Sequence, residues 1–173
     1  MNLQDKIYDV IDFPKKGIVF RDLTPLLLDP GYFKEAIRQM LGKIKNLKID
    51  VICGIDSRGF LFGPVLADRL NIGFVPVRKS NKLLPREIVE QKYDLEYGID
   101  GVKIHTDSIQ PGQRVLIVDD LLATGGTAKA TCQLVEKLDG KVAALLFLSE
   151  LTYLKPRTKL KKYKILSLVK YRI

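Results

Sequence analysis

The spacing of apolar positions along the chain predicts two strand–helix–strand units. Short continuous apolar runs, typical of strands buried on both faces of a parallel sheet, alternate with segments in which apolar positions follow a helical period. The predicted elements cover residues 49–55, 59–70 and 74–77 in the first unit and 115–118, 127–138 and 142–148 in the second. We therefore predict an α/β fold with a mostly parallel sheet flanked by helices.

Two further segments lie before and between these units. After Asp29, five apolar residues fall at helical spacing and predict a helix with one buried face: Phe33, Ile37, Met40, Leu41 and Ile44. Residues 78–91 are polar and basic with little periodicity, and they precede a predicted hairpin that turns at Asp100–Gly101. A long polar loop at this place is typical of a lid.

Composition places the chain among ordinary soluble globular proteins, with 173 residues, 46% hydrophobic and 28% charged. No apolar run reaches the roughly 20 residues that span a bilayer, and the first eight residues carry charges where a signal peptide is apolar. We expect a cytoplasmic protein without a membrane partner. Cys53 and Cys132 lie in apolar surroundings without the spacing of a zinc site or redox pair, so we expect reduced core thiols.

The net charge of +9 is concentrated at the carboxyl end of the chain. Residues 151–173 hold eight Lys or Arg and no acid, so the rest of the chain is nearly neutral. This tail could bind polyanions non-specifically. The interpretation that we favour is a solvated face of a last strand, in which these lysines accompany the apolar residues 165–169: Lys159, Lys161, Lys162 and Lys164.

The segment 115–127 carries the most specific chemistry. An apolar strand ends in Asp119 and Asp120, at the edge of a parallel sheet where α/β proteins bind ligands and where carboxylates can accept hydrogen bonds from vicinal hydroxyls. A small glycine loop then opens a helix and offers backbone N–H groups and hydroxyls to a phosphate: Ala123, Thr124, Gly125, Gly126 and Thr127. The alternative is a tight turn in which Asp120 and Thr124 only cap the helix. The combination of acids, glycines and threonines favours a sugar-phosphate site.

This segment resembles the phosphoribosyl-pyrophosphate (PRPP) motif of the type I phosphoribosyltransferases. Four more segments resemble, in the same order, the members of that family that act on adenine: residues 17–22, 57–63, 75–79 and 93–98. The similarity covers about residues 8–148. It implies the type I fold in a single domain, residues 1–173, with a small N-terminal hood over about 1–30 and a lid over about 78–98.

The resemblance implies a reaction and its partners. It is the Mg²⁺-dependent transfer of 5-phosphoribose from PRPP to adenine, which gives AMP and pyrophosphate, by a homodimer. Asp119 and Asp120 would hold the ribose hydroxyls, and the loop 123–127 the 5′-phosphate. Mg²⁺ would bind chiefly through PRPP oxygens and waters, so we expect no dedicated protein ligands for it. The only histidine, His105, is expected to be structural.

Basic residues are expected to hold and neutralise the pyrophosphate. Asp56, Ser57 and Arg58 close the first strand-to-helix turn, where backbone N–H groups and a guanidinium suit this anion. In the lid, Arg78, Lys79 and Lys82 would neutralise the leaving group, and Arg78 could serve the neighbouring subunit. The alternatives are a surface charge for Arg58 and a mobile basic loop for the lid. Asn81 and an extra leucine depart from the family pattern here.

Base recognition is expected from two other segments. By resemblance, Phe20 would stack on adenine while backbone groups of Val19 and Arg21 read its edge. Glu96 would exchange a proton with the imidazole ring of the purine, and Tyr97 would cover the lid side. The alternatives are a core phenylalanine and an exposed hairpin glutamate.

Two other functions remain open from the sequence. One is a regulator that binds PRPP as an effector and contacts nucleic acid through the basic tail, although such a protein needs neither Phe20 nor Glu96. The other is the same transfer to another base, such as hypoxanthine, guanine or xanthine. We do not expect nucleic acid to be a partner.

Overall fold

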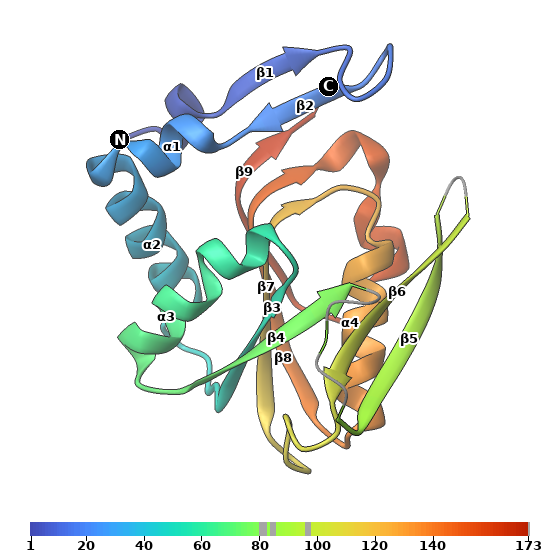
Figure 1. Cartoon of the computed structure of the whole chain (residues 1–173). Coiled ribbons are helices and arrows are strands. Elements are labelled where there is room, and N and C mark those ends of the chain that lie inside the picture. Colours follow the sequence, from blue (N-terminus) through green and yellow to red (C-terminus); the bar gives the residue numbers. More distant parts are fainter. Residues whose placement is uncertain (80–82, 84–85, 96–97, 173) are drawn as a thin grey trace. The chain divides into compact units, whose positions relative to one another are not determined.

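The computed structural model describes residues 1–79, 83, 86–95 and 98–172 (Figure 1). The chain divides into two compact units, Met1–Lys43 and Ile44–Ile173. The expected organisation of hood, lid and single domain stays a prediction. In the part of the chain that is described, no helix has the length and apolarity needed to cross a membrane.

The first unit combines a small antiparallel sheet with helices. Its elements are η1 (Leu3–Lys6), β1 (Tyr8–Ile11), β2 (Val19–Asp22), α1 (Thr24–Leu28) and α2 (Pro30–Ile44), the last of which extends one residue past the boundary. The Asp29 carboxylate accepts hydrogen bonds from the N–H groups of Gly31 and Tyr32 at the start of α2. Ala36, Ile37, Met40 and Ile44 are buried along one face, which confirms the predicted amphipathic helix.

The second unit contains the large sheet and its covering helices. Its elements are β3 (Val51–Ile55), η2 (Arg58–Leu61), α3 (Gly63–Leu70), β4 (Gly73–Lys79), β5 (Ile88–Leu95), β6 (Gly98–His105), β7 (Arg114–Leu122), α4 (Gly126–Lys137), β8 (Lys141–Leu151), η3 (Thr152–Leu154), η4 (Pro156–Lys159) and β9 (Ile165–Tyr171). Both predicted strand–helix–strand units are present. The first helix begins with a short 3-10 segment, and β7 continues through the two acids instead of ending before them.

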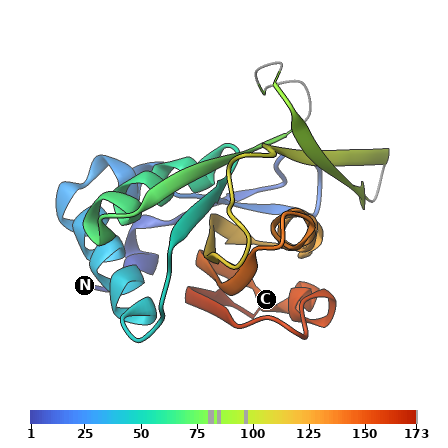
Figure 2. The ribbon, with the colours of Figure 1, turned by 90° about the horizontal axis from the view of Figure 1, so that it is seen from below.

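The seven strands lie in the order β5-β6-β4-β3-β7-β8-β9. Strands β4, β3, β7, β8 and β9 are mutually parallel, whereas β6 pairs antiparallel with both β4 and β5. This arrangement confirms the predicted fold class. The chain leaves β3 and β7 in opposite directions along the sheet, and Figure 2 shows α3 and α4 on opposite faces. A crevice therefore forms at the carboxyl ends of these two neighbouring strands.

The hydrophobic core of the second unit explains its strand pattern. All five residues of β3 are buried, as are the residues Val115–Val118 of β7, because helices cover both faces of the parallel strands. Cys53 and Cys132 are buried in this core as free thiols, as predicted. Burial raises the pKa of each thiol to about 12, which keeps both protonated and unreactive.

The predicted turn at Asp100–Gly101 is wrong. Asp100 pairs with Tyr93 and Gly101 with Lys92 inside the β5–β6 ladder, which closes at Leu95 and Gly98. The Asp-Gly pair is a strong local signal for a turn. Here the burial of Val102 and the cross-strand pairing extend β6 through it.

The tail lysines are solvated, but they do not lie on a strand. Lys159 ends η4, and Lys161, Lys162 and Lys164 lie between that turn and β9. All four are exposed. The strand itself begins only at Ile165, since Leu160 is fully buried and anchors the preceding segment to the core.

Candidate active site

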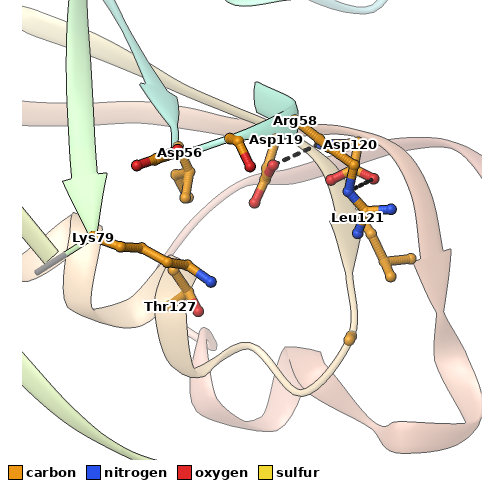
Figure 3. Close-up of a pocket in the computed structure, with 10 residues that line it drawn as sticks. Asp56, Arg58, Lys79, Asp119, Asp120, Leu121 and Thr127 are labelled. Atoms are coloured by element: carbon orange, nitrogen blue, oxygen red, sulfur yellow. Dashed lines mark hydrogen bonds and ion pairs between the residues drawn. The ribbon is translucent and has the colours of Figure 1, made fainter. Parts of the chain in front are cut away.

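A cavity of about 460 Å³ lies in the second unit at the carboxyl ends of β3 and β7 (Figure 3). The residues that line it come from the two strand ends, the end of β4 and the loop before α4: Ile55, Asp56, Ser57, Arg58, Lys79, Asp119, Asp120, Leu121, Ala123 and Thr127. Eight of these ten are among the predicted site residues. The topological switch point thus gathers residues up to 72 positions apart in the chain.

Backbone packing brings the segment after β3 directly against β7. A Cβ on Gly59 would lie 2.6 Å from the carbonyl oxygen of Val118, so only glycine allows this approach. The peptide bond between Asp56 and Ser57 is cis. Arg58, at the start of η2, faces the acids of β7.

The two acids of β7 are desolvated and lie close enough for their charges to interact. Arg58 Nε lies 3.0 Å from Asp120 Oδ2, and the Asp120 backbone N–H donates a 2.9 Å hydrogen bond to Asp119 Oδ1. Burial raises the pKa of both carboxyls, and the charge of Asp120 raises that of Asp119 further. Arg58 acts in the opposite direction on Asp120. Carboxylates held in this way gain from any ligand that donates hydrogen bonds to them.

Two cationic side chains at the end of β4 lie at or beside the cavity. Arg78 Nη1 lies 3.7 Å from Asp56 Oδ2, and its guanidinium carbon lies 5.5 Å from the centre of the Phe60 ring. The Lys79 side chain extends into the cavity towards Thr127 (Figure 3). Acids on one side and cations on the other suit a ligand with hydroxyl and phosphate groups.

The loop before α4 presents the amino end of a helix to the cavity. Gly125 is the N-cap of α4 with φ +80°, a conformation that glycine adopts without strain. Ala123 and Thr127 line the cavity, and Thr124, Gly125 and Gly126 complete the loop between them. The N–H groups of the first helical turn have no intrahelical acceptor, so this loop can bind an anion.

Gly125 also touches the tail, and this contact predicts a measurable effect. A Cβ at Gly125 would lie 2.9 Å from the carbonyl oxygen of Pro156, whereas Gly112, with φ +82°, has open space around it. We expect Gly125→Ala to lower the free energy of unfolding by about 2 kcal/mol and Gly112→Ala by about 1 kcal/mol. Urea denaturation measures both. Equal losses would show that Pro156 can move away from the added methyl group without lowering the free energy of unfolding further.

The predicted residues of the hood lie in the first unit. Phe20 on β2 is half-buried, and its ring meets Phe13 edge-on with centroids 5.4 Å apart. The ring is therefore only partly buried, and its role stays a prediction. Arg21 is buried and paired with Asp9, while Val19 pairs with Ile11 across the small sheet.

Three predicted residues, Lys82, Glu96 and Tyr97, lie outside the described residues, as does Asn81. Their roles rest on the sequence resemblance alone. His105 lies on β6 opposite Ile88. In the described ranges, no group of three or more His, Cys, Asp or Glu side chains is placed to hold a metal ion.

Sequence reasoning missed Ile55, Leu121 and Tyr93. The first two line the cavity because they flank the predicted acids, and their apolar character carried no functional signal. Tyr93 accepts a 3.0 Å hydrogen bond from the hydroxyl of Thr127. Its place in the segment 93–98 could have drawn attention to it, but its partner is 34 residues away.

Comparisons with known proteins agree with this geometry. The family model of the phosphoribosyl transferase domain matches residues 27–170. The chain is 53% identical to the adenine phosphoribosyltransferase of Carboxydothermus hydrogenoformans, over 99% of this chain and 100% of that one. The crystal structure of the Thermoanaerobacter pseudethanolicus adenine phosphoribosyltransferase superposes with a TM-score of 0.95 at 50% identity, covering 98% of each chain. The Trypanosoma brucei enzyme, solved with AMP, pyrophosphate and ribose-5-phosphate, gives 0.88 at 28% identity, covering 97% of this chain and 78% of that one.

Proposed function

This chain belongs to the phosphoribosyl transferase domain family, and within it to the adenine phosphoribosyltransferases, and we propose that the cavity of the second unit is where it transfers 5-phosphoribose from PRPP to adenine. The products are AMP and pyrophosphate. The observation that carries the proposal is that the paired acids of β7 and the loop at the start of α4 line the same cavity.

The acids of β7 bind the ribose of PRPP, and the loop before α4 binds its 5′-phosphate. Asp119 and Asp120 accept hydrogen bonds from the ribose hydroxyls, which compensates for the desolvation of the carboxylates. The 5′-phosphate lies against the N–H groups of the loop Ala123–Thr127 at the amino end of α4. PRPP is thereby held at both ends of its ribose, which orients the C1′ atom for attack.

The pyrophosphate lies on the side of the cavity that carries Ser57, Arg58 and Lys79, with Arg78 beside Asp56. As the bond from C1′ to pyrophosphate breaks, positive charge develops on the ribose and negative charge on the leaving group. The β7 acids stabilise the first and the cations the second. Lys82 adds a further cation, and a lid over residues 78–98 keeps water from the reactive sugar.

The cavity suits a magnesium ion that oxygens of PRPP and waters would hold, because the described residues form no metal cage of their own. The cavity offers the carboxylates of Asp56, Asp119 and Asp120, and Mg²⁺ prefers oxygen ligands while keeping several waters. The ion would be held mainly through the oxygens of PRPP, and these carboxylates line the same cavity. When bound, it supplies charge stabilisation to the departing pyrophosphate.

Phe20 of the N-terminal hood stacks on adenine, while the backbone of Val19 and Arg21 reads the edge of the base. The half-buried ring, braced by Phe13, supports this role. We expect Phe20→Leu to raise KM for adenine about ten-fold, because base stacking on an aromatic ring is lost. Phe20→Tyr keeps the aromatic ring, so its KM for adenine should stay close to that of the unchanged protein. Steady-state kinetics measures both. An equal loss of PRPP binding in Phe20→Leu would contradict this assignment.

Glu96 exchanges the proton of the purine imidazole ring, and Tyr97 covers the lid side. We also propose a cytoplasmic homodimer in which Arg78 can reach the neighbouring site. Size-exclusion chromatography with light scattering tests the assembly, and a monomer with full activity would contradict the shared site.

The activity test supplies Mg²⁺ and PRPP with one base at a time: adenine, hypoxanthine, guanine, xanthine, uracil or orotate. Nucleotide formation is followed by chromatography. We expect AMP only. A different nucleotide would keep the PRPP site and overturn the base assignment. PRPP binding without any product would instead favour a PRPP-responsive regulator.

A further inference from the structure

A chain of three side chains links the phosphate loop to the β5–β6 hairpin. The Thr127 hydroxyl donates a 3.0 Å hydrogen bond to the Tyr93 hydroxyl, which donates a 3.0 Å hydrogen bond to Asp100 Oδ2. Tyr93 and Asp100 are a cross-strand pair of the hairpin, and Thr127 belongs to the first turn of α4. Hydroxyl groups thus join two segments that lie more than 25 residues apart along the chain.

The direction of these hydrogen bonds follows from the number of protons available. An ionised carboxylate only accepts, so the single proton of Tyr93 is directed at Asp100. The other Asp100 oxygen, Oδ1, accepts the backbone N–H of Gly101 at 2.8 Å. The Tyr93 oxygen can then only accept from Thr127, which commits the one hydroxyl proton of Thr127 to the hairpin.

The Tyr93 hydroxyl keeps its proton throughout the working range of a cytoplasmic enzyme. Burial raises its pKa to about 12, and the charges of Asp100 and Asp119 act in the same direction. The order of donors is therefore the same at any pH near neutrality.

A phosphate bound at this loop competes with Tyr93 for the same proton. Phosphate oxygens, like a carboxylate, only accept hydrogen bonds, and a bond to a charged acceptor is stronger than one to a neutral hydroxyl. We propose that Tyr93 is a positioning residue that holds the Thr127 hydroxyl in the ligand-free protein and releases it when the 5′-phosphate of PRPP binds. This inference rests on the proposed function, since it takes the loop before α4 as the 5′-phosphate site.

The consequence is a contact that links phosphate occupancy to the hairpin. Without phosphate, the hairpin is tied to α4 through Thr127. With phosphate, Thr127 turns to the ligand and Tyr93 keeps only Asp100. Breaking the bond between Thr127 and Tyr93 opposes PRPP binding, so removing the Tyr93 hydroxyl should strengthen binding rather than weaken it.

Isothermal titration calorimetry with PRPP and Mg²⁺ tests whether removing the Tyr93 hydroxyl strengthens PRPP binding. We expect Tyr93→Phe to bind PRPP about five-fold more tightly. This factor corresponds to the typical net contribution of one neutral hydrogen bond, which the unchanged protein must break when PRPP binds. Thr127→Val should bind it more weakly, and the double variant should match Thr127→Val, because no proton remains to be released. Tyr163→Phe is the matched control, since Tyr163 donates to Glu136 and lines no part of this cavity.

Two smaller ligands separate this role from a structural one. Ribose 5-phosphate should show the same gain in Tyr93→Phe, whereas pyrophosphate, which lacks the 5′-phosphate, should show none. Tyr93→Phe with unchanged or weaker binding of ribose 5-phosphate would overturn the proposal, and so would an equal gain for pyrophosphate. Failure of the unchanged protein to bind PRPP would overturn the proposed function instead. Melting temperatures of all variants show that each one folds.

Discussion

Replacing Asp119 and Asp120 together by asparagine is expected to reduce activity about 1,000-fold and to remove the stabilisation of the fold by PRPP. Each ribose hydroxyl loses a charged acceptor, and a hydrogen bond to a charged group contributes about 1.5–3 kcal/mol. Melting with and without PRPP and Mg²⁺ measures the effect through the ligand-induced shift in Tm. A full shift in the double variant would exclude the two acids from ribose binding.

The single variant Asp119→Asn should at the same time stabilise the ligand-free protein at pH 7. Burial and the charge of Asp120 raise the folded-state pKa of Asp119 above its ordinary value of 3.8. The folded chain therefore binds more protons than the unfolded chain, and the stability linked to Asp119 is lost as pH rises above 3.8. Asparagine does not ionise, so the variant keeps this stability at pH 7. A lower Tm of the ligand-free variant at pH 7 would contradict the assigned direction.

Asp50→Asn provides a control of opposite sign. Asp50 binds Arg114 through both carboxylate oxygens, which lowers its pKa to about 2, and it lies outside the cavity. Its stabilisation is present above the ordinary pKa of 3.8 and is lost as pH falls towards 2. We expect Asp50→Asn to lower Tm at pH 7 while activity is unchanged.

Glu96→Gln is expected to lower kcat at least about 100-fold while PRPP binding survives. Glutamine cannot exchange the proton that leaves the purine, and general acid–base catalysis typically contributes 100- to 10,000-fold. Except for Lys82, the residues proposed for PRPP lie just after β3, on β4 and β7, and in the loop that opens α4, so the affinity for PRPP should be unchanged. Single-turnover kinetics and PRPP titration separate the two effects.

Glu87→Gln is the matched control for this variant, because Glu87 is an exposed glutamate immediately before β5. It should retain normal turnover. The role of Glu96 would be contradicted if both variants kept normal turnover, or if Glu96→Gln lost PRPP affinity together with kcat.

Local sequence patterns were sufficient to predict the elements that build the site. The apolar runs of β3 and β7, the helical spacing of α2 and the glycine loop before α4 are all decided by neighbouring residues, and the structure confirms each of them. The chemistry of Asp119, Asp120 and the loop was readable for the same reason, because their functional partners are adjacent in the chain. The assignment of roles to Phe20 and Glu96 depended on the family resemblance and stays a prediction.

Only the tertiary structure decided the pairings between distant segments. Arg58 meets Asp120, Gly125 meets Pro156, and Tyr93 meets Thr127, at separations that no local pattern encodes. The misplaced turn at Asp100–Gly101 has the same origin, since the strand β6 is extended by its pairing with β5. Backbone preferences act over a few residues, whereas sheet register, side-chain pairing and burial depend on which segments meet in space. The sequence by itself thus determined the family, the fold class and most of the residues at the crevice, and the folded chain decided how they are connected.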